Sequence, residues 1–216
     1  MIIPCDPLSD AAFQNLFGNP KNIDVSLDFL NAVFEALGDQ PVSRIKIIKP
    51  LQWGKFSGEK SPPPEALYLD TEGRPIQLVM VRKSYPELVK GMLFNWSKLY
   101  SLYFPRNLPC PGDFPVFTIW LHRNAFPTAA DWLHTMTMVS DEPSGPRLFF
   151  KDMHVVAVDV ERWKNRTQLS TGDLDRRRRL DQWLSFLTLR KGDIFDPPLR
   201  TSDDSLFEKA VDALGR

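Results

Sequence analysis

Four consecutive arginines, Arg176 to Arg179, form the strongest basic run of the sequence. A basic run on a helix can contact the phosphates of a nucleic acid. Three aspartates flank the run and weaken its positive field, namely Asp173, Asp175 and Asp181. A solvated helix face is therefore the simpler interpretation, and Arg176 and Arg177 are kept as candidate DNA contacts.

The sulfur and imidazole side chains predict no zinc site. The two cysteines are Cys5 and Cys110, and the three histidines are His122, His134 and His154. They form no Cys-x-x-Cys pair and do not complete a zinc-ligand spacing. Reduced thiols in a cytoplasmic protein are the expected state.

Length and charge set broad limits on the function. The chain has 216 residues, which favours one domain with a small appendage. Lys+Arg and Asp+Glu both total 27, so bulk charge gives no support for nucleic-acid binding. The start of the chain, Met1 to Pro4, does not resemble a signal peptide. No stretch approaches the ~20 apolar residues of a membrane span, so no membrane contact is expected.

The apolar periodicity predicts a mixed α/β fold. Helices are expected where apolar residues recur at helical spacing, over 10–17, 25–37, 88–104 and 176–189. Ser9 is the expected cap of the first helix, and Leu93 is expected on the apolar face of the third. A capping box that begins at Ser205 predicts a further helix at the C-terminus. Strands are expected over 44–48, 66–69, 76–81, 116–121, 132–139, 147–150 and 154–160. A loop is expected over 53–64. The turn Asp70 to Gly73 predicts a hairpin between the second and third strands.

Several motifs, taken in the order in which they occur along the chain, resemble those of the transposase-associated PD-(D/E)XK nuclease family, which includes the recombination-promoting nucleases. The similar segments run from the first helix to about residue 190: Asp10 to Gly18, Leu27 to Val33, Trp96 to Tyr100, Val116 to Leu121, Met153 to Trp163 and Trp183 to Leu187. The resemblance implies a restriction-endonuclease-like core, with a mixed central sheet flanked by helices. It suggests a nuclease-like domain over 1–190 and a C-terminal helical extension over 191–216.

The resemblance also implies a Mg²⁺-dependent site on the hairpin. In such nucleases an aspartate on the first hairpin strand and a glutamate on the second hold the cation. A lysine or glutamine two residues after the glutamate helps to orient the water. Mg²⁺ prefers hard oxygen ligands, lowers the pKa of its bound water and neutralises phosphate charge.

This chain departs from that pattern at the hairpin. Alignment on Gly73 places the glutamate position at Val79 and the glutamine position at Val81. The aspartate position falls near Glu65, and Asp70 is a nearby turn carboxylate. Because a valine can neither bind a cation nor move a proton, the resemblance implies a nuclease scaffold with an impaired site.

Positions elsewhere depart in the same direction. Gln14 replaces the family's lysine, and Gly91 and Asn95 stand where arginine and tyrosine are usual. Lys98 is a candidate phosphate contact, although a solvated helix position explains it about as well. Asp10 is a weak candidate metal ligand, because an acid in the first turn is also favoured by the helix dipole.

Three functions remain open from the sequence. The first is a catalytically impaired nuclease-fold protein that binds DNA without cutting it, or binds a protein partner, an active paralogue or a second copy of itself. The second is an active Mg²⁺-dependent DNA endonuclease whose catalytic residues have moved, with Asp10, Glu65 and Asp70 as the candidate acids. The third is an interaction protein unrelated to nucleases.

Overall fold

The computed structural model describes residues 1–49, 63–82, 87–105, 113–123, 131–166, 174–196 and 204–215. Most of the loop expected over 53–64 lies outside these ranges, as do Cys110 and Asp173. No helix within the described ranges is long and apolar enough to cross a membrane.

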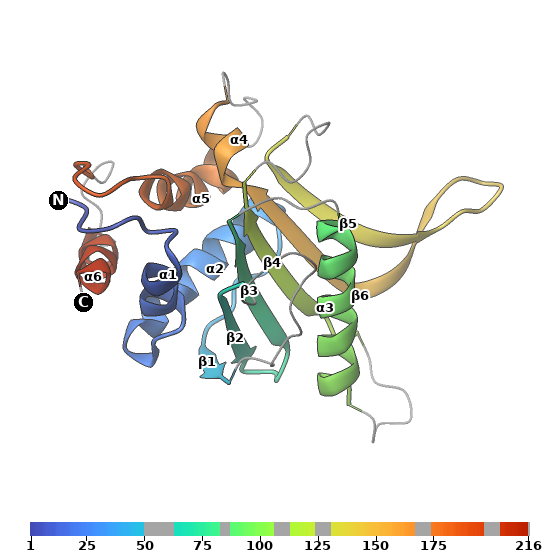
Figure 1. Ribbon diagram of the computed structural model, residues 1–216. Helices are drawn as coiled ribbons and strands as arrows, with labels where there is room; N and C mark the ends of the chain where they lie inside the picture. Colours follow the sequence, from blue (N-terminus) through green and yellow to red (C-terminus); the bar gives the residue numbers. More distant parts are fainter. Residues whose placement is uncertain are drawn as a thin grey trace.

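A six-stranded sheet forms the centre of the described structure (Figure 1). Its strands are β1 (Ile45–Ile48), β2 (Glu65–Asp70), β3 (Pro75–Val81), β4 (Val116–His122), β5 (Leu133–Ser140) and β6 (Arg147–Asp159). Their order across the sheet is β1-β2-β3-β4-β6-β5. The neighbours β3, β4 and β6 are parallel, and the remaining pairs are antiparallel.

Helices cover both faces of this sheet. They are α1 (Asp10–Phe17), α2 (Ile23–Leu37), α3 (Leu88–Tyr103), α4 (Val160–Lys164), α5 (Leu174–Leu187) and α6 (Asp204–Leu214). The helices α1, α2, α5 and α6 share one apolar core with the sheet, whereas α3 packs on the other face (Figure 1). This arrangement confirms the expected α/β, restriction-endonuclease-like core.

The strand β3 shows how the sheet is buried from both sides. Successive side chains of a strand point to opposite faces. Leu78 and Met80 pack in the core with α1 and α2, whereas Val79 and Val81 pack beneath α3. All seven residues of β3 and all seven of β4 are buried, which explains why both read as continuous apolar runs.

Most predicted element ends are confirmed. Ser9 caps α1 by accepting a hydrogen bond from the Ala12 amide at 3.3 Å. Gly38 ends α2 with a φ of 77°, and Gly73 closes the β2–β3 turn with a φ of 79°. Both values lie in the left-handed region, where glycine carries no Cβ penalty.

Several local predictions are wrong. The strands expected over 147–150 and 154–160 are one continuous strand, β6, which pairs with β4 and β5. Leu93 is exposed, because the buried face of α3 is formed by residues such as Met92 and Leu99. Helix α6 begins at Asp204, so Ser205 lies within it and is not its cap. Helix α4 was not predicted.

The C-terminal helix packs against the same core as the rest of the chain. The Phe207 ring centroid lies 4.8 Å from that of Trp183 and 5.8 Å from that of Phe186. Near the other end of the chain, Ile2 forms an isolated antiparallel bridge with Ile194. The division at residue 190 stays a prediction.

A buried histidine lies at the carboxyl end of β4. The side chains of His122 and Asp159 are fully buried, and Nδ1 of His122 lies 3.9 Å from Oδ2 of Asp159. Burial lowers the pKa of His122 to about 4, although the Asp159 carboxylate opposes this shift. The folded protein therefore favours a neutral imidazole at this position.

Because His122 is buried in its neutral form, we expect the folded protein to become less stable in mild acid. Its folded pKa lies below the ~6.5 of an unfolded histidine, so the unfolded chain binds the proton first. The free energy of unfolding should fall as the pH decreases from about 6.5 towards about 4. Urea unfolding measured between pH 5 and pH 7 checks this slope, and His122→Gln should flatten it. Burial also lowers the pKa of His154, so some slope should remain. Equal slopes in variant and wild type would contradict the prediction.

Candidate functional site

The register of the hairpin decides which residues face each other. Glu65 of β2 lies directly opposite Val79 of β3, and Leu67 lies opposite Gln77. Directly opposed residues of an antiparallel pair project to the same face. The positions expected to hold the two metal-binding carboxylates are therefore cross-strand neighbours on the face covered by α3, and one of them is valine.

The Glu65 side chain is engaged with protein groups. Its Oε2 accepts a hydrogen bond from Nε2 of Gln77 at 2.6 Å, and the residue is 7% exposed. Helix α1 is held against the same strand, because Gln14 Nε2 donates to the Glu65 carbonyl at 3.1 Å. The Tyr68 hydroxyl donates to the Phe17 carbonyl at 2.6 Å, and burial raises the pKa of Tyr68.

On the opposite strand, β3, the side chains beneath α3 at positions 79 and 81 are apolar. Val79 and Val81 are each 1% exposed and belong to a cluster that includes Leu67, Trp96 and Trp120. Fully burying an apolar side chain of this size stabilises the fold by roughly 1.5–3 kcal/mol. The valines therefore contribute to the core and supply no ligand atom.

Asp70 lies at the other end of β2 from Glu65. Five residues separate them, which corresponds to about 16 Å along a strand, and their side chains point to opposite faces. The Asp70 carboxylate accepts hydrogen bonds from the amides of Glu72 and Arg74 and from Arg74 Nε at 2.6 Å. Asp70 thus stabilises the turn, and the structure does not bring it to Glu65.

Asp10, the third candidate acid, lies in the first turn of α1. Its Oδ1 is 3.3 Å from Nη1 of Arg82, and both side chains are more than half exposed. An exposed ion pair of this kind contributes little to stability. Within the described ranges, no group of three or more His, Cys, Asp or Glu side chains is arranged to hold a metal ion.

These residues do not fit the magnesium site implied by the resemblance. Mg²⁺ requires octahedral oxygen coordination and is usually held through one or two carboxylates and substrate phosphates. Here a single carboxylate, Glu65, shares its Oε2 with Gln77 and faces the methyl groups of Val79. Within the described ranges, the hairpin therefore presents one carboxylate beneath α3 where the resemblance implies two.

Polar residues remain beneath α3, and the sequence reasoning singled out Asn95 but missed Gln77 and Thr118 as members of this group. Gln77 lies opposite Thr118 of β4 in the register. Gln77 Oε1, Thr118 Oγ1 and Asn95 Oδ1 are buried without a hydrogen-bond partner among the described residues. A buried polar atom left unsatisfied costs about 1–3 kcal/mol. Polar residues within otherwise apolar segments were the available signal.

A basic edge, defined by Arg82, Arg123, Lys164 and Arg190, was also missed. Arg82 and Arg123 directly follow the parallel strands β3 and β4. Arg123, Lys164 and Arg190 line a pocket of about 370 Å³. A small hollow lined by Arg82 and Arg123 adjoins this pocket, because the two share Leu8, Arg123 and Val160. An arginine after each of two buried strands was the available signal.

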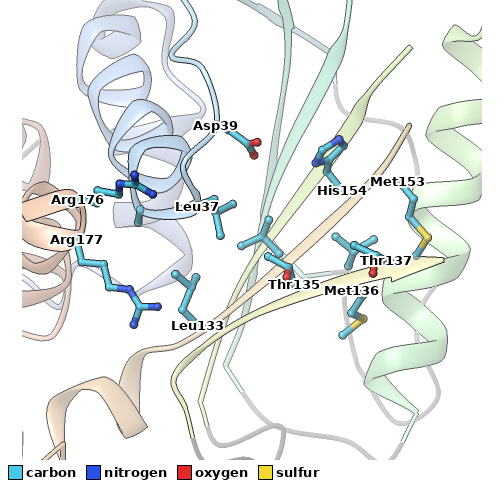
Figure 2. Close-up of a pocket in the computed structure, with 13 residues that line it drawn as sticks. Leu37, Asp39, Leu133, Thr135, Met136, Thr137, Met153, His154, Arg176 and Arg177 are labelled. Carbon is cyan, nitrogen blue, oxygen red and sulfur yellow. The ribbon is translucent and has the colours of Figure 1, made fainter. Parts of the chain in front are cut away.

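The predicted DNA contacts do not form one surface. Lys98 lies on α3, which covers one face of the sheet, whereas Arg176 and Arg177 lie on α5, which packs on the other. Arg176 and Arg177 line a separate pocket with residues of β5 and β6 (Figure 2). Their contact with DNA stays a prediction.

Comparison with known proteins identifies the scaffold. Residues 7–216 match the family model described as PD-(D/E)XK nuclease family transposase. No curated protein and no solved structure matches the chain. The matched range includes both strands of the hairpin and the helices on either side of the sheet. The chain therefore belongs to the PD-(D/E)XK nuclease family transposases.

Proposed function

We propose that this chain is a catalytically impaired member of its family that binds DNA without cutting it. The observation that carries the proposal is the register of the hairpin, which sets Glu65 opposite the buried Val79. Metal-assisted phosphodiester hydrolysis needs a cation to generate the nucleophile and to neutralise phosphate charge. Because one of the two expected carboxylates is missing, the hairpin cannot hold that cation in the usual way.

The positions of the three candidate acids do not support an active site whose catalytic residues have moved. Glu65 and Asp70 lie at opposite ends of β2, and Asp10 pairs with Arg82. An interaction protein with an unrelated fold is disfavoured by the β2–β3 hairpin and by the family match. Binding without cleavage remains the function that best agrees with the geometry.

The basic edge is the surface proposed to contact DNA. Ligands of open α/β sheets bind outside the carboxyl ends of parallel strands, which is where Arg82 and Arg123 lie. Asp10 lies 3.3 Å from Arg82 and Asp6 lies 4.0 Å from Arg123, and ion pairs as exposed as these are weak. Glu161 also lines the pocket. Lys164 and Arg190 are also exposed. These cations are therefore accessible to phosphates.

A second candidate function is binding of a protein partner or of a second copy of the chain. The outer face of α3 carries exposed apolar side chains, including Phe94 and Leu102. Met138, Val139 and Leu148 are also exposed on the β5–β6 hairpin. Exposed apolar groups that gather on one surface often mark protein contacts.

The missing carboxylate leads to a prediction about cleavage. The purified protein should not nick supercoiled plasmid in Mg²⁺ or Mn²⁺, because Val79 leaves the hairpin with one carboxylate. Gel analysis of the plasmid measures this directly. Glu65→Ala tests the remaining acid, and Glu72→Ala on the exposed turn is its matched control. Metal-dependent nicking that Glu65→Ala abolishes and Glu72→Ala preserves would show that the proposal is wrong.

A second experiment tests the basic edge. Arg123→Gln should weaken binding of a labelled DNA duplex to a similar extent for different sequences, because phosphate contacts carry little sequence information. It should also make the slope of log affinity against log salt shallower by about 0.9 for the lost contact. Fluorescence anisotropy over a range of salt concentrations measures both effects.

The matched control for this experiment is Arg178→Gln. Arg178 is an exposed arginine of α5, outside the basic edge. Its substitution should leave affinity and salt slope unchanged. If Arg123→Gln and Arg178→Gln have equal effects, the edge is not the contact surface. If the wild type shows no salt-dependent DNA binding, the protein-partner function becomes the better proposal.

A further inference from the structure

A pocket of about 420 Å³ lies on the face of the sheet opposite the Glu65–Val79 pair. Its walls are the end of α2, the strands β5 and β6 and the start of α5 (Figure 2). The polar residues that line it are Asp39, Thr135, Thr137, His154, Arg176 and Arg177. Neither the family match nor the proposed DNA surface assigns a role to this pocket.

Opposite charges line this pocket without pairing. Arg176 enters from α5, and Asp39 follows the end of α2 (Figure 2). Within the described ranges, neither side chain forms an ion pair, either with the other or with a third residue. The Arg176 guanidinium lies beside Gly38, where the negative end of the α2 dipole favours a cation. An anionic group and a hydrogen-bond donor could therefore bind in the same pocket.

The guanidinium of Arg177 is held in position by Asp131 and Trp132. Arg177 Nη1 lies 3.6 Å from Oδ2 of Asp131, and the guanidinium carbon lies 5.5 Å from the Trp132 ring centroid. Its side chain is 18% exposed, so the contacts restrict its rotamers while one side still borders the pocket. A guanidinium suits a phosphate, because it can donate two parallel hydrogen bonds.

The remaining polar lining is neutral. His154 stacks on Phe117 with ring centroids 4.3 Å apart, and burial lowers the pKa of His154. Thr135 and Thr137 of the edge strand β5 also line the pocket. Hydroxyls and a neutral imidazole both donate and accept hydrogen bonds. The lining therefore suits a ligand with several polar atoms.

We propose that this pocket binds a small phosphomonoester that carries a hydrogen-bond donor at its far end, a class that includes nucleoside monophosphates. Arg176 would bind the phosphate, Arg177 would add positive charge to the same wall, and Asp39 would accept from the amino group or ring N–H. The volume of about 420 Å³ lies within the range of typical small-molecule sites. A phosphate at the end of a nucleic acid has the same chemistry, so the test separates the two sources.

Calorimetric titration of the full-length protein with AMP and with inorganic phosphate tests this site. AMP should bind more tightly than phosphate. Arg176→Gln should weaken AMP binding by about tenfold or more, because it removes charge-assisted hydrogen bonds. Asp39→Asn should weaken AMP binding and leave phosphate binding unchanged or slightly stronger. Arg178→Gln, on the same helix but outside the pocket, should change neither.

Three outcomes would overturn the proposal. The first is absence of AMP binding at millimolar concentration in wild-type protein that unfolds cooperatively. The second is an equal loss of binding in Arg176→Gln and Arg178→Gln. The third is a DNA-duplex affinity that falls in Arg176→Gln as strongly as AMP affinity, which would assign the guanidinium to nucleic acid. Because Arg176 is exposed, these variants should keep the wild-type unfolding midpoint.

Discussion

Burial of the sheet on both faces is the constraint on which the rest of this structure depends. Every residue of β3 and β4 is buried, because helices α1, α2, α5 and α6 pack on one face and α3 on the other. A polar side chain on these strands must find its partner inside the protein. Gln77 of β3 does so by donating a 2.6 Å hydrogen bond from Nε2 to Oε2 of Glu65 on β2.

The same constraint explains why a valine is tolerated where the family pattern expects a carboxylate. Two opposed carboxylates under α3 would repel each other in a region of low dielectric unless a cation lay between them. Val79 removes this requirement and adds apolar packing to the cluster around Trp120. The scaffold therefore does not depend on the chemistry of the original site, and fold alone does not establish function.

Binding surfaces are therefore expected at the edges of the sheet, where helices do not cover both faces. The arginines after β3 and β4 lie at the carboxyl edge of the sheet, and a pocket opens where α2 and α5 flank the strands β5 and β6. The two surfaces use different arginines, so substitutions can separate them. Phosphate chemistry suits both, and the two pockets share no lining residue.

The sequence by itself determined the ends of α1 and α2, the β2–β3 hairpin, the buried strand β4 and the valine at position 79, because capping residues, turn glycines and apolar periodicity are local signals. Tertiary structure alone decided that Arg176 and Asp39 border one pocket. It also gathered Arg123, Lys164 and Arg190. These groupings depend on strand order and on packing between residues far apart in sequence, which no local pattern contains.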